Sequence, residues 1–190
     1  MGGITLKLVF IAGGVRSGKS AFAEALASNS YTPEGRLVYM ASGVAMDSEM
    51  KQRIARHQQD RERQSMTWHT IEAPLRIGAV MSTLREGDVV LWDCVTTWLT
   101  NMMYMPMQNK TINSSERLEE ARGIVKDALA TIRTRDITLY VVSNELFDEP
   151  DLRHNELNHY RKVLGDIHQW LVAEADEAYE LTEGIAKQWK

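Results

Sequence analysis

Two kinds of hydrophobic pattern alternate along the chain. Short runs of apolar residues, rich in β-branched and aromatic side chains, are typical of buried β-strands. Between them lie longer stretches in which apolar residues recur at every third or fourth position, which is the period of an amphipathic α-helix. The pattern predicts strands at 6–12, 37–41, 68–72, 89–94, 137–142 and 178–182. It predicts helices at 21–27, about 48–63, 74–85, 95–104, about 113–132 and about 151–171.

Single residues mark where several of these elements begin or end. Pro74 suits the first turn of a helix, and Asp151 suits an N-cap. Asn113 followed by Glu116 resembles a capping box. The stretch 178–182 predicts a last strand at the edge of the sheet. Strands that alternate with helices predict one mostly parallel α/β sheet with helices on both faces.

The turn after the first strand carries a phosphate-binding motif. It fits the pattern of a glycine, any four residues, then glycine, lysine and serine, and it stands between a buried strand and a helix start, as the motif requires. Its glycines let the backbone approach a ligand, so that N–H groups of the loop and of the helix N-terminus bind a di- or triphosphate. The predicted nucleotide-binding residues are Gly13, Gly14, Val15, Arg16, Ser17, Gly18, Lys19 and Ser20. The motif in this setting predicts a P-loop NTPase-like fold.

Three side chains have expected roles around this loop. Lys19 reaches the terminal phosphates, and the hydroxyl of Ser20 ligates Mg²⁺. Asp93 ends an apolar strand, where an acid in phosphate-loop proteins supports Mg²⁺ beside the loop serine. We therefore expect Ser20 and Asp93 as metal ligands, with Asp93 in the nucleotide site. An aspartate at a strand end can instead cap the next helix, and the sequence leaves both interpretations open.

Composition narrows the class of protein. The chain has 190 residues, of which 44% are hydrophobic and 25% are charged, so we expect one globular domain over residues 1–190. The net charge is −4 and no block of basic residues stands out, so we expect no nucleic-acid partner. No apolar run is long enough to span a membrane. The single cysteine, Cys94, cannot form an internal disulfide, which suits a reducing cytoplasm.

His57 is a second candidate for chemistry. It follows Met50 and Ile54 on one face of a predicted helix, so it could be a half-buried histidine on the apolar side. Arg53 lies one turn before it and Arg56 beside it. A neutral imidazole is a nucleophile toward phosphorus, and arginines can hold a phosphate, so a catalytic role is the other interpretation.

Four segments together resemble one family. Residues 13–20 are similar to its signature loop, which includes the arginine–serine pair, and residues 46–57 resemble its second motif. Residues 91–101 look like its third motif and residues 141–145 like its fourth, in the right order over nearly the whole chain. The family is the bifunctional adenosylcobinamide kinase/adenosylcobinamide-phosphate guanylyltransferase of cobalamin biosynthesis.

The resemblance implies a two-step enzyme that acts on a corrinoid. A nucleoside triphosphate, ATP or GTP, first phosphorylates the aminopropanol hydroxyl of adenosylcobinamide. GTP then guanylylates a histidine, which falls on His57 here, and GMP moves to the corrinoid phosphate to give adenosylcobinamide-GDP. With Lys19, His57 is thus expected to be catalytic, and Arg53 and Arg56 are expected to contact the nucleotide phosphates. The family also implies a homotrimer.

Two other functions remain open. A P-loop small-molecule kinase with only one of the two activities is compatible with the motif. Arg56 precedes His57 where the family usually has paired histidines, and residues 146–150 lack the usual glycines. A nucleotide-binding switch protein without transferase activity is also compatible. Covalent labelling by GTP favours the two-step enzyme, phosphate transfer without a covalent intermediate favours the kinase, and slow hydrolysis without an acceptor favours the switch.

Overall fold

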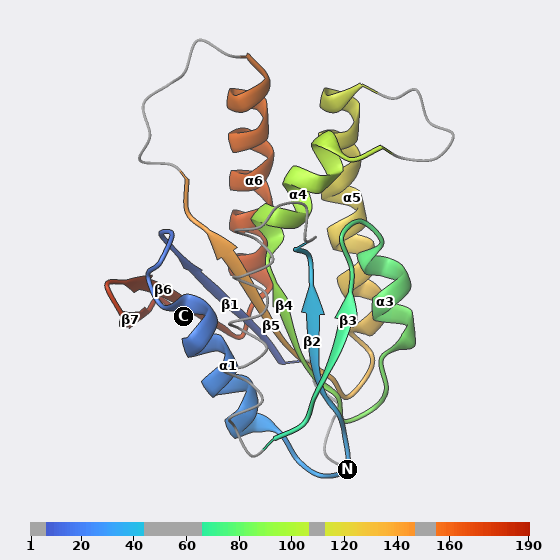
Figure 1. Ribbon diagram of the computed structural model, residues 1–190, viewed down its shortest axis with the longest axis vertical. Coiled ribbons are helices and arrows are strands. Elements are labelled where there is room, and N and C mark those ends of the chain that lie inside the picture. Colours follow the sequence, from blue (N-terminus) through green and yellow to red (C-terminus); the bar gives the residue numbers. More distant parts are fainter. Residues whose placement is uncertain (1–6, 44–65, 107–112, 147–154) are drawn as a thin grey trace.

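The computed structural model describes residues 7–43, 66–106, 113–146 and 155–190. Seven strands form one sheet in the order β3-β2-β4-β5-β1-β6-β7 (Figure 1). The strands are β1 (Lys7–Gly13), β2 (Leu37–Ala41), β3 (Trp68–Glu72), β4 (Val89–Asp93), β5 (Thr138–Asn144), β6 (Glu177–Thr182) and β7 (Ile185–Gln188). The helices are α1 (Lys19–Ser30), α3 (Ile77–Thr83), α4 (Val95–Tyr104), α5 (Ser114–Ile132) and α6 (Asn155–Glu174).

All neighbouring strands are parallel except β6 and β7. The carboxyl ends of β1 to β6 therefore meet at one edge of the sheet, and α5 and α6 extend beyond that edge (Figure 1). This arrangement confirms the predicted α/β class with a mostly parallel sheet. It also brings Gly13, Asp93 and Asn144, which are distant in sequence, to the same edge.

Alternating side chains of each strand enter two separate cores. On β1, Val9 and Ile11 pack toward α1, whereas Leu8 and Phe10 join the core beneath the other helices. The second core holds buried side chains from α3, α4, α5 and α6. They pack against strand residues such as Trp92 of β4, which is fully buried. Helices thus cover both faces, as predicted, because the central strands β1, β2, β4 and β5 bury side chains on both sides.

Local signals set the start of α5. The side chain of Asn113 accepts a hydrogen bond from the Glu116 N–H at 2.9 Å, and the Glu116 carboxylate accepts from the Asn113 N–H at 3.3 Å. This is the predicted capping box, in which each side chain satisfies a backbone donor of the other. The apolar side chains of Leu118 and Val125 on this helix are buried.

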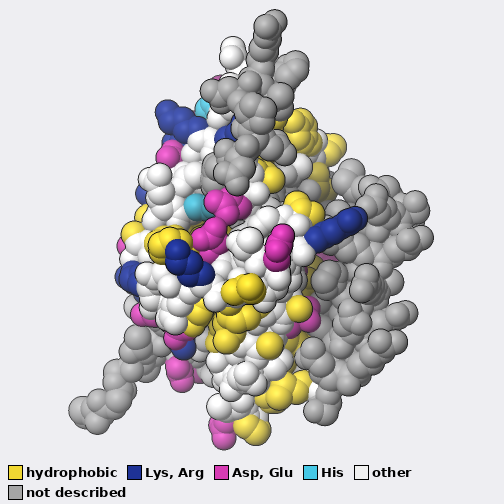
Figure 2. Space-filling view, turned by 90° about the vertical axis from the view of Figure 1, so that its left-hand side faces the viewer, with side chains coloured by type: hydrophobic (Ala, Val, Ile, Leu, Met, Phe, Trp, Pro, Cys, Tyr) yellow, Lys and Arg dark blue, Asp and Glu magenta, His cyan; other side chains and the backbone are white. Residues whose placement is uncertain are grey.

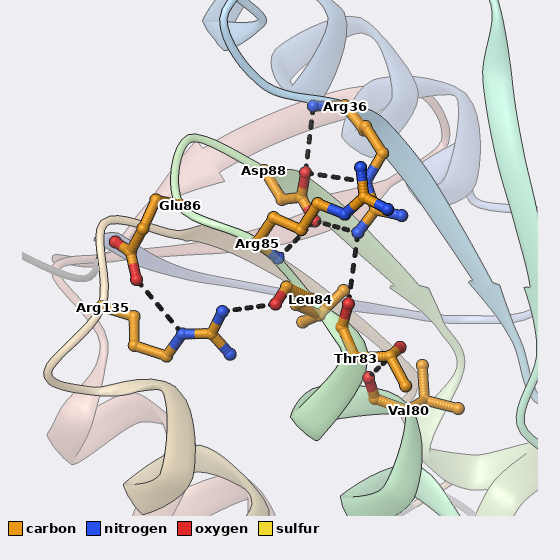
Figure 3. A network of polar contacts seen from close by, with 8 residues as sticks. All are labelled: Arg36, Val80, Thr83, Leu84, Arg85, Glu86, Asp88 and Arg135. Atoms are coloured by element: carbon orange, nitrogen blue, oxygen red, sulfur yellow. Dashed lines mark hydrogen bonds and ion pairs between the residues drawn. The ribbon is translucent and has the colours of Figure 1, made fainter.

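A buried ion pair ties β2 to β4 at the amino-terminal edge of the sheet (Figure 3). Asp88 is 1% exposed, and its carboxylate accepts hydrogen bonds from the backbone N–H and the guanidinium of Arg36, at distances of 2.6–3.1 Å. The backbone N–H of Arg85 donates to the same carboxylate at 2.8 Å. Each carboxylate oxygen is therefore satisfied, and this offsets the cost of burying the charge.

The expected helix start at Pro74 is wrong. The backbone N–H of Ala73 continues the parallel ladder by donating to Ala41 O at 2.8 Å. The next two carbonyls accept side-chain bonds from α4: Pro74 O from Asn101 Nδ2 at 3.1 Å, and Leu75 O from Trp98 Nε1 at 2.9 Å. These long-range bonds hold the segment outside a helix, so α3 begins only at Ile77.

The expected edge position of the last predicted strand is also wrong. β6 lies between β1 and a further strand, β7, which pairs with it antiparallel. Glu183 and Gly184 form the two-residue turn between them, both with positive φ, at 51° and 82°. This is the geometry of a tight hairpin turn, and it makes β7 the edge.

Two predictions concern residues outside the described ranges: the helix at about 48–63 and the N-cap at Asp151.

Met102 and Met103, near the end of α4, are buried and pack in the core. None of the helices in the described ranges is both long and apolar enough to cross a membrane.

Candidate functional site

The loop between β1 and α1 has the shape of a phosphate cradle. Gly18 is the N-cap of α1 and has φ 90°, so no side chain caps the first amides of the helix. Arg16, at the exposed tip, has φ 63°, a left-handed conformation that costs about 1 kcal/mol for a residue other than glycine. Free amides at a helix N-terminus are typical of sites that bind anions. A residue kept in an unfavourable backbone conformation, such as Arg16, is typical of functional loops.

Lys19 lies inside this cradle. Its side chain is 5% exposed, and its Nζ donates to Gly14 O at 2.9 Å, across the loop. The ammonium is therefore held where the loop closes on itself, at the positive end of α1. Ser20 follows in the first turn of the same helix and is half-buried.

The β6–β7 hairpin supports the loop from the side. Gly184 N–H donates to Ser17 O at 2.9 Å, and a Cβ on Gly18 would lie 3.6 Å from the Gly184 Cα. A Cβ on Gly13 would lie 2.4 Å from Leu181 O and 2.8 Å from Ser17 Oγ. The sequence analysis did not predict that the hairpin contacts the loop. The available turn signal was Gly184, which follows the predicted strand 178–182.

We expect Gly13→Ala to reduce kcat/KM for the nucleotide by roughly a hundredfold, because the new methyl group must displace the loop from Leu181 by roughly 1 Å. Steady-state kinetics with the nucleotide varied measures this change. Gly78→Ala is the matched control, because a Cβ there meets nothing within 4 Å. Equal kcat/KM in the two variants would contradict a tightly fitted loop.

Asp93 lies at the same edge but not on the neighbouring strand. β5 separates β4 from β1, so Asp93 is about two strand spacings from the loop, roughly 10 Å. Tyr39 donates its hydroxyl to Asp93 Oδ2 at 2.9 Å. The N-cap of α4 is Cys94, and no side chain caps that helix, so the interpretation of Asp93 as a helix cap is wrong.

A buried polar network joins the strand ends around Asp93. Thr96 Oγ1 accepts hydrogen bonds from the backbone and side-chain N–H groups of Asn144, at 3.2 and 3.0 Å. The Tyr160 hydroxyl, from α6, donates to Thr96 O at 3.0 Å. Cys94 Sγ lies 3.1 Å from Thr96 Oγ1, and burial raises the pKa of this thiol. Cys94 is therefore a neutral packing residue and not a nucleophile.

The oxygen donors at this edge suit a hard cation such as Mg²⁺, which takes carboxylate, hydroxyl and phosphate oxygens. Across the described segments, no three His, Cys, Asp or Glu side chains gather to form a metal site of their own. A Mg²⁺ ion held here would need the phosphates and water as further ligands. This is the usual way in which Mg²⁺ is bound with a nucleotide.

The structure thus brings together two groups of predicted site residues. The loop 13–20 and Asp93 share the carboxyl edge of the sheet. Arg53, Arg56 and His57 lie outside the described residues. Beyond the predicted residues, Tyr39 and the β6–β7 hairpin contribute contacts that only the folded chain reveals.

Solved structures with a similar arrangement include the flagellar accessory protein FlaH from Methanocaldococcus jannaschii, at 18% identity with a TM-score of 0.47, over 100% of this chain and 80% of that one. A DnaB-like replicative helicase has 12% identity and a TM-score of 0.49, over 92% of this chain and 46% of that one.

Curated relatives are more informative. The bifunctional adenosylcobalamin biosynthesis protein CobP of Pseudomonas aeruginosa is 39% identical over 137 residues, which cover 71% of this chain and 69% of that protein. The corresponding CobU of Escherichia coli K12 is 28% identical over 187 residues, covering 96% of this chain and 99% of that protein. Residues 9–188 match the family model described as cobinamide kinase / cobinamide phosphate guanyltransferase. With nearly its whole length in the match, this chain belongs to the cobinamide kinase/cobinamide phosphate guanyltransferase family.

Proposed function

We propose that this protein phosphorylates the hydroxyl of adenosylcobinamide with a nucleoside triphosphate and then transfers GMP from GTP to the product. The observation that carries the proposal is the loop 13–20, with its buried Lys19 and the uncapped start of α1, at the edge that also holds Asp93. This arrangement is suited to a triphosphate. Family membership supports the choice of acceptor and of reactions.

In the first step, the aminopropanol oxygen attacks the terminal phosphorus of the nucleotide. The new O–P bond forms as the bond to the bridging oxygen breaks, the nucleoside diphosphate leaves, and the hydroxyl proton passes to solvent. Lys19 and the amides of the loop stabilise the charge that develops on the phosphoryl oxygens. Arg16, Ser17 and the remaining residues of the loop hold the nucleotide in line with the acceptor.

In the second step, we assign the nucleophile to His57, with Arg53 and Arg56 contacting phosphate. A neutral ring nitrogen attacks the α-phosphorus of GTP, and pyrophosphate leaves. A phosphate oxygen of the corrinoid phosphate then attacks the same phosphorus. The N–P bond breaks, the diphosphate bridge of adenosylcobinamide-GDP forms, and the imidazole is restored.

We propose that Ser20 and Asp93 hold Mg²⁺. Bound with the nucleotide, this ion supplies positive charge that offsets the phosphate oxygens. Tyr39 supports the role of Asp93, because its hydroxyl fixes the orientation of the carboxylate through Oδ2.

We further propose that the protein acts in the cytoplasm as a homotrimer. The first proposal is supported by Cys94, the single cysteine of the chain, which is a buried free thiol. The second rests on the family resemblance, and sedimentation at micromolar protein concentration tests it.

Labelled GTP tests the proposed function. The protein is incubated with adenosylcobinamide, Mg²⁺ and GTP labelled at either the α- or the γ-phosphate. We expect the γ-label first in adenosylcobinamide phosphate and then, retained in the diphosphate bridge, in adenosylcobinamide-GDP, whereas the α-label should enter only adenosylcobinamide-GDP. Transfer of the γ-label alone would identify a single-activity kinase, and hydrolysis with neither product would favour a nucleotide switch.

A further inference from the structure

A pocket of about 500 Å³ lies between α6 and the β6–β7 hairpin, on the face of the sheet opposite α1. Phe10 and Ala12 of β1 and Ala178 of β6 form its floor, and His168 and Val172 of α6 form one wall. Figure 2 shows the side of the molecule that carries the hairpin, where hydrophobic, acidic, basic and histidine side chains lie next to one another. The volume is in the range of small-molecule sites.

The pocket adjoins the phosphate loop. Ala12, on its floor, directly precedes Gly13. Glu145, on its wall, donates its backbone N–H to Gly13 O at 3.0 Å. A molecule in the pocket therefore lies beside the first residue of the loop, but on the other side of β1 from α1. A molecule held there would approach the loop from the side of β1 opposite α1.

An exposed indole forms the rim of the pocket. Trp189 is 61% exposed, yet its Nε1 donates to Glu180 Oε2 at 2.9 Å. Lys187 Nζ lies 3.5 Å from the centroid of the same ring. The large apolar surface of Trp189, together with Val172 at 38% exposure, is thus held beside the cavity. Exposed apolar side chains that are fixed around a hollow are typical of ligand sites.

The charges of the lining select the kind of ligand. Glu145 and Glu180 bring carboxylates. Two lysines touch the rim but are already engaged: Lys187 Nζ lies on the Trp189 ring, and Lys190 Nζ donates to Val172 O and Ala173 O at 3.3 and 2.8 Å. Burial lowers the pKa of His168 to about 4, so this wall is neutral at physiological pH. Such a pocket disfavours a triphosphate and suits an apolar body that carries N–H donors.

We propose that the pocket binds the acceptor: one edge of the corrin macrocycle packs on Val172 and Trp189, and its carboxamide N–H groups donate to Glu145 and Glu180. The aminopropanol arm then extends past Ala12 toward the phosphate loop. This assignment rests on the proposed function and adds the residues that hold the corrinoid. A corrin ring supplies both the apolar edge and the neutral donors that the lining requires.

Substitution of a pocket residue by arginine tests the assignment. We expect Val172→Arg to raise both the KM for adenosylcobinamide and its Kd, measured by equilibrium dialysis without nucleotide, by about tenfold or more, and to leave the KM for GTP unchanged. Trp189→Ala should act in the same direction by loss of packing. Ala173→Arg is the matched control, because Ala173 is the next residue of α6, is exposed and is not part of the lining.

The possible outcomes separate the two proposals. If the parent protein phosphorylates adenosylcobinamide but Val172→Arg binds it as tightly as the parent, the assignment of the pocket is wrong and the proposed function stands. Val172→Arg could instead change the sedimentation of the protein and leave its corrinoid affinity unchanged. That result would also contradict the assignment and would identify the pocket as part of an interface between copies of the chain. A parent protein that neither binds nor phosphorylates the corrinoid would overturn the proposed function and the pocket's ligand with it.

Discussion

Lys19→Ala should abolish phosphoryl transfer while the protein remains folded. Lys19 Nζ lies inside the phosphate loop, 2.9 Å from Gly14 O, with its side chain 5% exposed. Loss of this cation removes a charge-assisted contact of about 1.5–3 kcal/mol, so nucleotide affinity should fall about ten- to hundredfold. The effect on kcat should be larger still, because charge grows on the phosphoryl oxygens in the transition state.

Three variants isolate the charge from its packing. Lys19→Met keeps an unbranched apolar stem in the buried position and should be as inactive as Lys19→Ala. Lys126→Ala removes an exposed lysine of α5 and should be fully active. Nucleotide binding by calorimetry and transfer of γ-label to the corrinoid are measured for each variant. Normal turnover by Lys19→Met would show that the ammonium is not required and would contradict the assignment of the site.

His57→Asn should abolish guanylyl transfer but leave the kinase step largely intact. The hypothesis is that His57 carries GMP as a phosphoramidate, so α-labelled GTP should give a labelled protein and γ-labelled GTP should not. An N–P bond to histidine breaks in acid and survives alkali. Because the attack needs a neutral imidazole, labelling should also fall as the pH drops below about 6.5, the ordinary pKa of histidine.

His69→Asn provides the matched control. His69 is an exposed histidine on β3, the opposite edge strand from β7, and its loss should change neither label. Mass spectrometry of the digested protein locates the adduct. An adduct on a residue other than His57, or full GMP transfer by His57→Asn, would overturn the mechanism. Kinase activity without any adduct in the parent would favour the single-activity kinase.

The amino-acid sequence by itself determined the elements whose signals are local. Apolar runs and the helical period place β2, β3 and α4 at the predicted residues, because both signals depend on neighbouring positions alone. The capping box at Asn113 is equally local. The phosphate loop was predictable for the same reason, since its strand, turn and helix are contiguous in the chain.

Tertiary structure decided what depends on contacts between distant segments. Pro74 suits a helix start. However, side chains of α4 donate hydrogen bonds to the carbonyls of Pro74 and Leu75, so the helix begins only at Ile77. Nothing local to Asp93 specifies that β5 separates it from the loop, because strand order is set by which faces can be buried together. The support of Gly13 by Leu181 and the pocket beneath Trp189 likewise arise only when the last hairpin packs beside the first strand.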